Sequence, residues 1–294
     1  MIDSGELVAW FGHAQRDLAW RRPGVTAWQI LVSEFMLQQT PVARVEPIWL
    51  DWVARWPTPS ATAAAGPADV LRAWGKLGYP RRAKRLHECA TVIATDHDDV
   101  VPSDVETLLS LPGVGAYTAR AIACFAYRQR VPVVDTNVRR VVARAVHGRA
   151  DAASASVRDL ADVETLLPSG PDAPVFSAAL MELGATVCTA RTPRCGLCPL
   201  SRCAWRGLGY PPGTPARRVQ RYAGTDRQVR GRLLDILRDS SAPVSRARLD
   251  TAWPADPAQR DRALDSLLVD GLVEQTGDGR YALCGEGGDA GALP

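Results

Sequence analysis

Lysine is nearly absent from this 294-residue chain, in which Lys76 and Lys84 are the only two among 35 basic side chains. The other cations are arginines, whose guanidinium group stays protonated and cannot form a Schiff base. Covalent catalysis through a side-chain amine is therefore restricted to two positions.

The sequence also lacks a long apolar run, and no segment approaches the length of a membrane span. Acidic residues at Asp3, Glu6 and Asp17 do not fit a basic-then-apolar signal peptide. A hydrophobic fraction of 46% and a charged fraction of 23% are ordinary for a globular protein. We expect two or three domains, no membrane partner and a cytoplasmic location.

Acidic residues are absent or isolated in three stretches that are rich in basic side chains. The range 70–87 holds six basic residues and no acid, and the range 183–225 holds seven arginines and no acid. Between Glu106 and Asp151, seven arginines surround Asp135, the only carboxylate in that interval. Although the net charge is only +3, this distribution favours a nucleic acid or an acidic membrane as partner.

The pentapeptide 111–115, Leu-Pro-Gly-Val-Gly, predicts a tight turn between two helices. Its glycines, Gly113 and Gly115, allow backbone N–H groups to approach an anion at the start of the next helix. We interpret this turn as a phosphate-binding element, and the isolated Asp135 as either a helix cap or a catalytic acid.

Four of the seven cysteines, in the spacing C-x6-C-x2-C-x4-C, are Cys188, Cys195, Cys198 and Cys203. Four thiolates in so short a loop can enclose one metal centre. Zinc is one possibility, but a single C-x2-C pair between longer arcs better suits an iron-sulfur cluster. The remaining cysteines are expected to be buried apolar thiols: Cys89, Cys124 and Cys284.

The Leu-Pro-Gly-Val-Gly turn, followed by the segment 133–141, resembles the helix-hairpin-helix DNA glycosylases. In that superfamily the aspartate after the hairpin is catalytic, which implies this role for Asp135. The cysteine loop 188–203 looks like the 4Fe-4S loop of endonuclease III and of MutY-type enzymes, except that their last spacing is usually x5. The resemblance implies that Arg191 and Arg194 face the DNA backbone.

The segment 33–40, Ser-Glu-Phe-Met-Leu-Gln-Gln-Thr, closely matches the S-E-x-M-L-Q-Q-T motif of MutY-type adenine DNA glycosylases. The match implies that Glu34 is the general acid and that Gln39 fills the gap left by an extruded base. Leu77-Gly78-Tyr79 similarly resembles a segment whose tyrosine wedges into the duplex. We expect the range 28–37 to form a helix that Pro41 ends.

Four residues near the amino terminus resemble the adenine pocket of the same family: Arg16, Leu18, Trp20 and Arg21. Ala19 departs from the family's usual proline. Tyr117 occupies the position at which endonuclease III-type lyases carry lysine, so the resemblance implies a monofunctional enzyme. Asn137 is expected to assist Asp135, which donors and arginines should keep ionised, while an apolar pocket keeps Glu34 protonated.

The carboxy-terminal part does not resemble the nudix-like domain usual in the family. Residues 211–225 read as a linker, 226–284 as a winged-helix-like module and 285–294 as a flexible tail. The predicted recognition helix mixes Arg260 and Arg262 with several aspartates, which favours packing over DNA reading.

The sequence therefore predicts a mainly α-helical fold, with a helix-hairpin-helix glycosylase region at 1–210 and the winged-helix-like module behind it. We expect a monomeric, nucleoid-associated enzyme with a 4Fe-4S cluster that removes adenine opposite 8-oxoguanine from double-stranded DNA, with adenine opposite guanine as a further candidate substrate. A thymine-mismatch glycosylase and a non-catalytic iron-sulfur DNA sensor are the alternatives.

Overall fold

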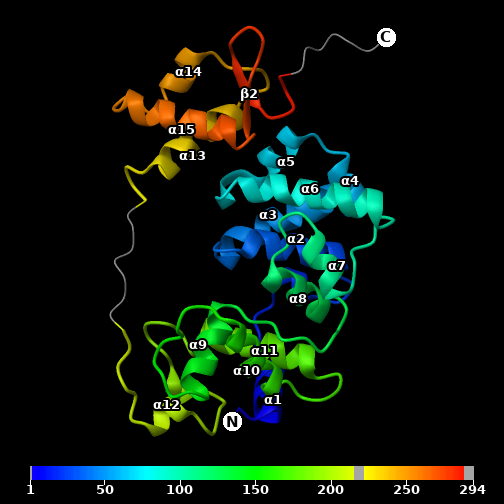
Figure 1. Ribbon diagram of the computed structural model, residues 1–294, viewed down its shortest axis with the longest axis vertical. Coiled ribbons are helices and arrows are strands. Elements are labelled where there is room, and N and C mark those ends of the chain that lie inside the picture. Colours follow the sequence, from blue (N-terminus) through cyan, green and yellow to red (C-terminus); the bar gives the residue numbers. More distant parts are fainter. Residues whose placement is uncertain (1, 215–221, 288–294) are drawn as a thin grey trace. The chain divides into compact units, whose positions relative to one another are not determined.

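The computed structural model describes residues 2–214 and 222–287, coloured along the chain in Figure 1. Within these residues, fifteen α-helices and a single two-stranded sheet confirm the predicted mainly α-helical fold. The chain forms two compact units. The first comprises residues 1–31, 103–110 and 114–217, and the second comprises residues 32–102, 111–113 and 218–294.

The first unit is built around a core between three helices. These are α1 (Ser4–Ala14), α9 (Thr136–Ala145) and α11 (Ala173–Thr186), whose apolar faces bury Leu7, Val138 and Phe176. The surrounding helices are α7 (Val105–Ser110), α8 (Ala116–Phe125), α10 (Val157–Leu166) and α12 (Ala204–Gly207). Burial of these faces, more than intrinsic propensity, holds such short helices.

The first part of the second unit, residues 32–102, contains four complete helices in sequence order: α3 (Val42–Arg55), α4 (Pro59–Ala63), α5 (Pro67–Trp74) and α6 (Arg81–Asp96). Trp52 and Trp74 are fully buried there, with their rings edge to face at 6.1 Å. The helix α2 (Ala27–Leu37) begins in the first unit and ends in the second, and its bounds confirm the helix predicted over 28–37.

The predicted hairpin around 111–115 is present, because α7 ends just before the turn and α8 begins just after it. Gly113 has φ +77°, and a Cβ there would lie 2.8 Å from the Cβ of Arg85 and 2.9 Å from Phe35. Only glycine fits such a position. Gly115 caps α8 with φ −95° and open space around it, so its backbone does not require glycine.

The carboxy-terminal module has three helices, α13 (Asp226–Arg238), α14 (Arg246–Asp250) and α15 (Pro257–Val269). An antiparallel hairpin of β1 (Val273–Gln275) and β2 (Tyr281–Leu283) follows. Parts of the expected linker and tail, at 215–221 and 288–294, lie outside the described residues.

In the part of the chain that the structure describes, no helix combines the length and the apolar character needed to cross a membrane.

Candidate active site and cysteine loop

Glu34 lies in the last two turns of α2, where its neighbours Leu31, Val32, Phe35 and Met36 are buried. Glu34 itself is only 7% exposed. A carboxylate is costly to bury, so Glu34 stands out among the mostly apolar buried side chains of this helix.

Gln39 and Tyr79, both predicted to contact DNA, share an unusual backbone. Each has positive φ, +57° for Gln39 and +49° for Tyr79, which costs free energy in residues that carry a side chain. Arg82 holds the two turns, because its guanidinium donates to the carbonyls of Phe35 (2.9 Å) and Gln38 and lies over the Tyr79 ring at 4.9 Å. Burial lowers the pKa of Arg82.

Asp135 is the N-cap of α9, in the first unit. Its carboxylate accepts hydrogen bonds from the Val138 backbone N–H at 2.7 Å and from Asn137 Nδ2 at 2.8 Å. Nevertheless burial raises the pKa of Asp135, against the lowering effect of these donors and of Arg140. Desolvation therefore has a larger effect on the Asp135 pKa than the donors and arginines that the sequence displays.

Asn137 is held on its other side by Arg140, whose Nη2 donates to Asn137 Oδ1 at 2.7 Å and to the Gly184 carbonyl at 2.6 Å. Gly184 in α11 was not singled out from the sequence. A Cβ there would lie 2.7 Å from the Cβ of Asn137, so the close approach of α11 requires glycine. Tyr117, at the start of α8, packs against the cluster of Ala121, Cys124 and Val133.

Two of the four residues predicted to form the adenine pocket, Arg16 and Arg21, pair with a carboxylate that was not singled out from the sequence. Glu182, fully buried in α11, accepts from Arg16 Nε at 2.5 Å and from Arg21 Nη1 at 2.9 Å. Burial alone raises the pKa of Glu182, but its hydrogen bonds with the two arginines outweigh burial and lower it. Leu18 and Trp20, beside these arginines, are buried. One signal was available, because Glu182 is the only acid between Asp172 and Asp226.

The four thiols of the cysteine loop line one cavity together with Val141, Leu183, Val187 and Leu200. Arg144 and Arg206 also line this cavity. Four cysteine thiolates are the ligand set of a 4Fe-4S cluster, so the residues around the cavity fit that cofactor. When bound, the cluster supplies metal–thiolate bonds that cross-link the loop.

Arg144 anchors the cysteine loop from α9. Its guanidinium donates to the Thr189 carbonyl at 2.7 Å and to Cys188 Sγ at 3.5 Å, and it lies over the Trp205 ring at 4.8 Å. Within the same loop Arg191 and Arg194 are exposed, and no acid in the described residues pairs with them. Their side chains are therefore available to an outside anion.

Comparisons with known proteins agree with these observations. The model of the HhH-GPD superfamily base excision DNA repair proteins matches residues 32–162. The model of the iron-sulfur binding domain of endonuclease III matches residues 188–202, which supports the 4Fe-4S cofactor.

Among curated relatives, the adenine DNA glycosylase of Mycolicibacterium smegmatis is 78% identical and covers 97% of both chains. The adenine DNA glycosylase of Homo sapiens is 40% identical over 67% of this chain, but over only 38% of the human protein. Among solved structures, a thermostable thymine-DNA glycosylase matches 70% of this chain and 95% of its own, with a TM-score of 0.64 and 26% identity. An endonuclease III–DNA complex at 21% identity and TM-score 0.60 supports the fold.

Proposed function

The chain belongs to the adenine DNA glycosylases of base excision repair, and we propose that it removes adenine mispaired with 8-oxoguanine, by hydrolysis alone. The observation that carries this proposal is the segment 33–40, which places a buried glutamate inside a motif typical of MutY-type enzymes. A binding-only iron-sulfur sensor would need neither Glu34 nor Asp135.

In this proposal Glu34 donates a proton to adenine, because the base leaves poorly as an anion. Positive charge then grows on the sugar as the glycosidic bond lengthens, and Asp135 stabilises it. Asn137 and the Val138 N–H orient the Asp135 carboxylate. Because burial raises its pKa, Asp135 is less stabilised as an anion than an exposed aspartate and is better able to respond to a nearby cation.

DNA binding is proposed for three elements of the chain. The turn at Gly113 and the amino terminus of α8 suit a phosphate, and the exposed Arg191 and Arg194 suit the backbone of the duplex. Gln39 and Tyr79 are proposed to fill the space that the extruded adenine leaves, since their strained backbones present them at turns.

The proposal is tested with single-turnover assays on duplexes that contain A:8-oxoguanine, A:G, T:G or A:T. We expect base release from A:8-oxoguanine, slower release from A:G, and none from T:G. Glu34→Gln should abolish release and retain binding. Preferential release of thymine from T:G would overturn the assignment of the base.

Strand cutting is tested separately by borohydride trapping. With Tyr117 at the position where a lyase carries its amine, we expect free base and an intact abasic strand. A strong covalent enzyme–DNA adduct would contradict the monofunctional proposal, and Lys76→Gln and Lys84→Gln variants would then identify the amine.

A further inference from the structure

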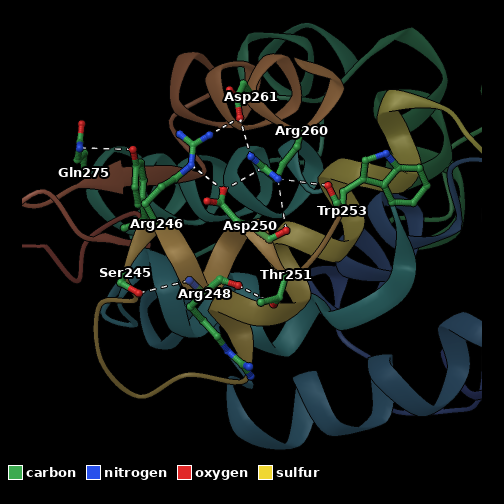
Figure 2. Close-up of polar contacts among 10 residues, drawn as sticks. Ser245, Arg246, Arg248, Asp250, Thr251, Trp253, Arg260, Asp261 and Gln275 are labelled. Atoms are coloured by element: carbon green, nitrogen blue, oxygen red, sulfur yellow. Dashed lines mark hydrogen bonds and ion pairs between the residues drawn. The ribbon is translucent and has the colours of Figure 1, made fainter. Parts of the chain in front are cut away.

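The carboxy-terminal module uses its own acids to neutralise arginines of α14 and α15. Figure 2 shows Arg246 and Arg260 alternating with Asp250 and Asp261, so that both arginines contact both acids. Arg262, further along α15, pairs with Asp226 of α13. These side chains are committed within the module, which leaves them poorly suited to phosphate contacts.

The charge of the module points the same way. Residues 222–287 hold nine arginines and eleven acidic residues, so the module carries a small negative charge. A module that binds DNA usually presents a surplus of cations on one face. Electrostatics therefore favours a basic partner surface over a nucleic acid.

The basic partner surface lies on α6 of the same unit. Asp270, directly after α15, has a side chain only 5% exposed and pairs with Arg81 of α6 and with Arg230 of α13. The Asp270 carbonyl accepts from Lys84 Nζ at 3.4 Å. Gly271 permits this approach, because it has φ +61° and a Cβ there would lie 2.6 Å from Lys84 Nζ.

A second contact ties the module to α5. Arg72 donates to the carbonyls of Ser240 (2.8 Å) and Arg238 (3.3 Å), and it also pairs with Glu286. In the reverse direction, Arg238 Nε donates to the Leu71 carbonyl at 3.1 Å. Interlocked hydrogen bonds from both sides fix the orientation of the module on α5 and α6 more firmly than isolated surface ion pairs would.

The helix that receives these contacts begins at the turn of Tyr79. Arg81, held by Asp270, stands next to Arg82, which connects the Tyr79 ring to the carbonyls of Phe35 and Gln38. The backbone of Tyr79 is strained, and strained turns persist only where their surroundings hold them.

We propose that the carboxy-terminal module is an intramolecular brace for the Tyr79 turn, and that Asp270 is its positioning residue. The proposal rests on the proposed role of Tyr79 in DNA. It gives the module a structural task within the reaction: to keep the start of α6 ordered while Tyr79 enters the duplex.

The test compares Asp270→Asn with Asp265→Asn in the full-length protein. Asp265 is an exposed acid on the same helix, without an ion pair in the described residues, so its variant removes the same charge from outside the contact. Amide hydrogen exchange without DNA should become at least five-fold faster over residues 79–85 in Asp270→Asn alone. Equal exchange in both variants would overturn the proposal.

Single-turnover release of adenine provides the second measurement. We expect Asp270→Asn to slow release five- to twenty-fold at saturating enzyme, with little change in affinity for undamaged duplex. An unchanged rate would overturn the brace even if exchange is faster, and tighter DNA binding with an unchanged rate would indicate a module that competes with DNA. If Asp270→Asn does not fold, Arg81→Gln, whose side chain is 70% exposed, replaces it in the exchange experiment.

Failure of the proposed function is distinguishable from failure of the brace. A wild-type protein that releases no base from any duplex refutes the function, whereas the exchange experiment requires no substrate and still decides whether Asp270 orders the Tyr79 turn.

Discussion

Two stretches of this chain look alike in sequence and differ in structure. Residues 70–87 and 183–214 both lack acids and are rich in basic side chains. No other feature of their charge distinguishes the two stretches. In the first, Arg72, Lys76, Arg81 and Lys84 all contact the carboxy-terminal module. In the second, Arg191 and Arg194 are exposed, without an acidic partner in the described residues.

The difference shows that a basic stretch does not by itself identify a DNA-binding surface. The cations of 70–87 contact carboxylates and carbonyls of the same chain, whereas Arg191 and Arg194 of the cysteine loop have no acidic partner in the described residues. Counterion release, which drives DNA binding, depends on cations that are free to reach phosphates. We therefore expect the two stretches to respond in opposite ways to substitution.

The largest effect should follow from loss of the cluster. Cys198→Ser removes one ligand of the cysteine loop, and we expect loss of the brown colour and of visible absorbance. DNA affinity should fall further than it does when Arg191 and Arg194 alone are replaced, because the whole loop that carries them loses its frame. Iron analysis and duplex titration measure both. Cys284→Ser, a half-buried thiol in the module, is the matched control and should retain iron.

Replacing exposed cations should weaken DNA binding next most. The double variant Arg191→Gln and Arg194→Gln should lower duplex affinity roughly ten-fold and reduce the salt dependence, the slope of log K against log salt, by about 1.8. The matched pair Lys76→Gln and Arg72→Gln removes the same charge from the docked stretch. An equal loss of slope in this pair would contradict the comparison.

The free energy of unfolding should depend more on the arginines that dock the carboxy-terminal module than on the exposed arginines of the cysteine loop. Arg238 has a side chain only 10% exposed and donates to the Leu71 carbonyl, so Arg238→Ala should lower the free energy of unfolding by roughly 1–3 kcal/mol, since a buried acceptor is left unsatisfied. Arg191→Ala should change it by less than about 0.5 kcal/mol. Urea denaturation of both variants compares them, and similar losses would refute the distinction.

The smallest effect concerns pH. Burial acts to raise the pKa of Asp270, but hydrogen bonds from Arg81 and Arg230 outweigh it and lower the pKa below its ordinary value. The resulting stabilisation is fully present above the unfolded-state pKa of about 3.9 and is lost as the pH falls through the lower folded-state value. In Asp270→Asn the decline of stability below about pH 4 should be shallower than in wild type, whereas Arg191→Gln should leave that decline unchanged.

Local patterns predicted much of the fold and of the site. Periodic apolar residues and Pro41 indicated the helix that carries Glu34, and the glycine turn indicated the hairpin, because both depend on neighbouring residues. The spacing of four cysteines indicated a shared metal centre, and the thiols do line one cavity. Gly115 was assigned a conformational need that its φ of −95° does not support.

Features that depend on distant residues were missed. Glu182 meets Arg16 across 166 positions of sequence, and neither helix pattern nor charge count indicates that pairing. The burial of Asp135 likewise cannot be found in the sequence, which displays the nearby donors but not the desolvation that outweighs their effect on its pKa.

The sequence by itself determined the family and the residues to which we assign its chemistry: a glutamate in a glycosylase motif, an aspartate after a hairpin, a tyrosine at the place of a lyase's amine, and four thiols in one loop. Tertiary structure alone decided which arginines remain available to DNA and which dock the carboxy-terminal module. The physical reason is the distance along the sequence over which each effect acts. Motifs and helix caps act over a few residues, whereas burial and ion pairing depend on groups that only the folded chain brings together.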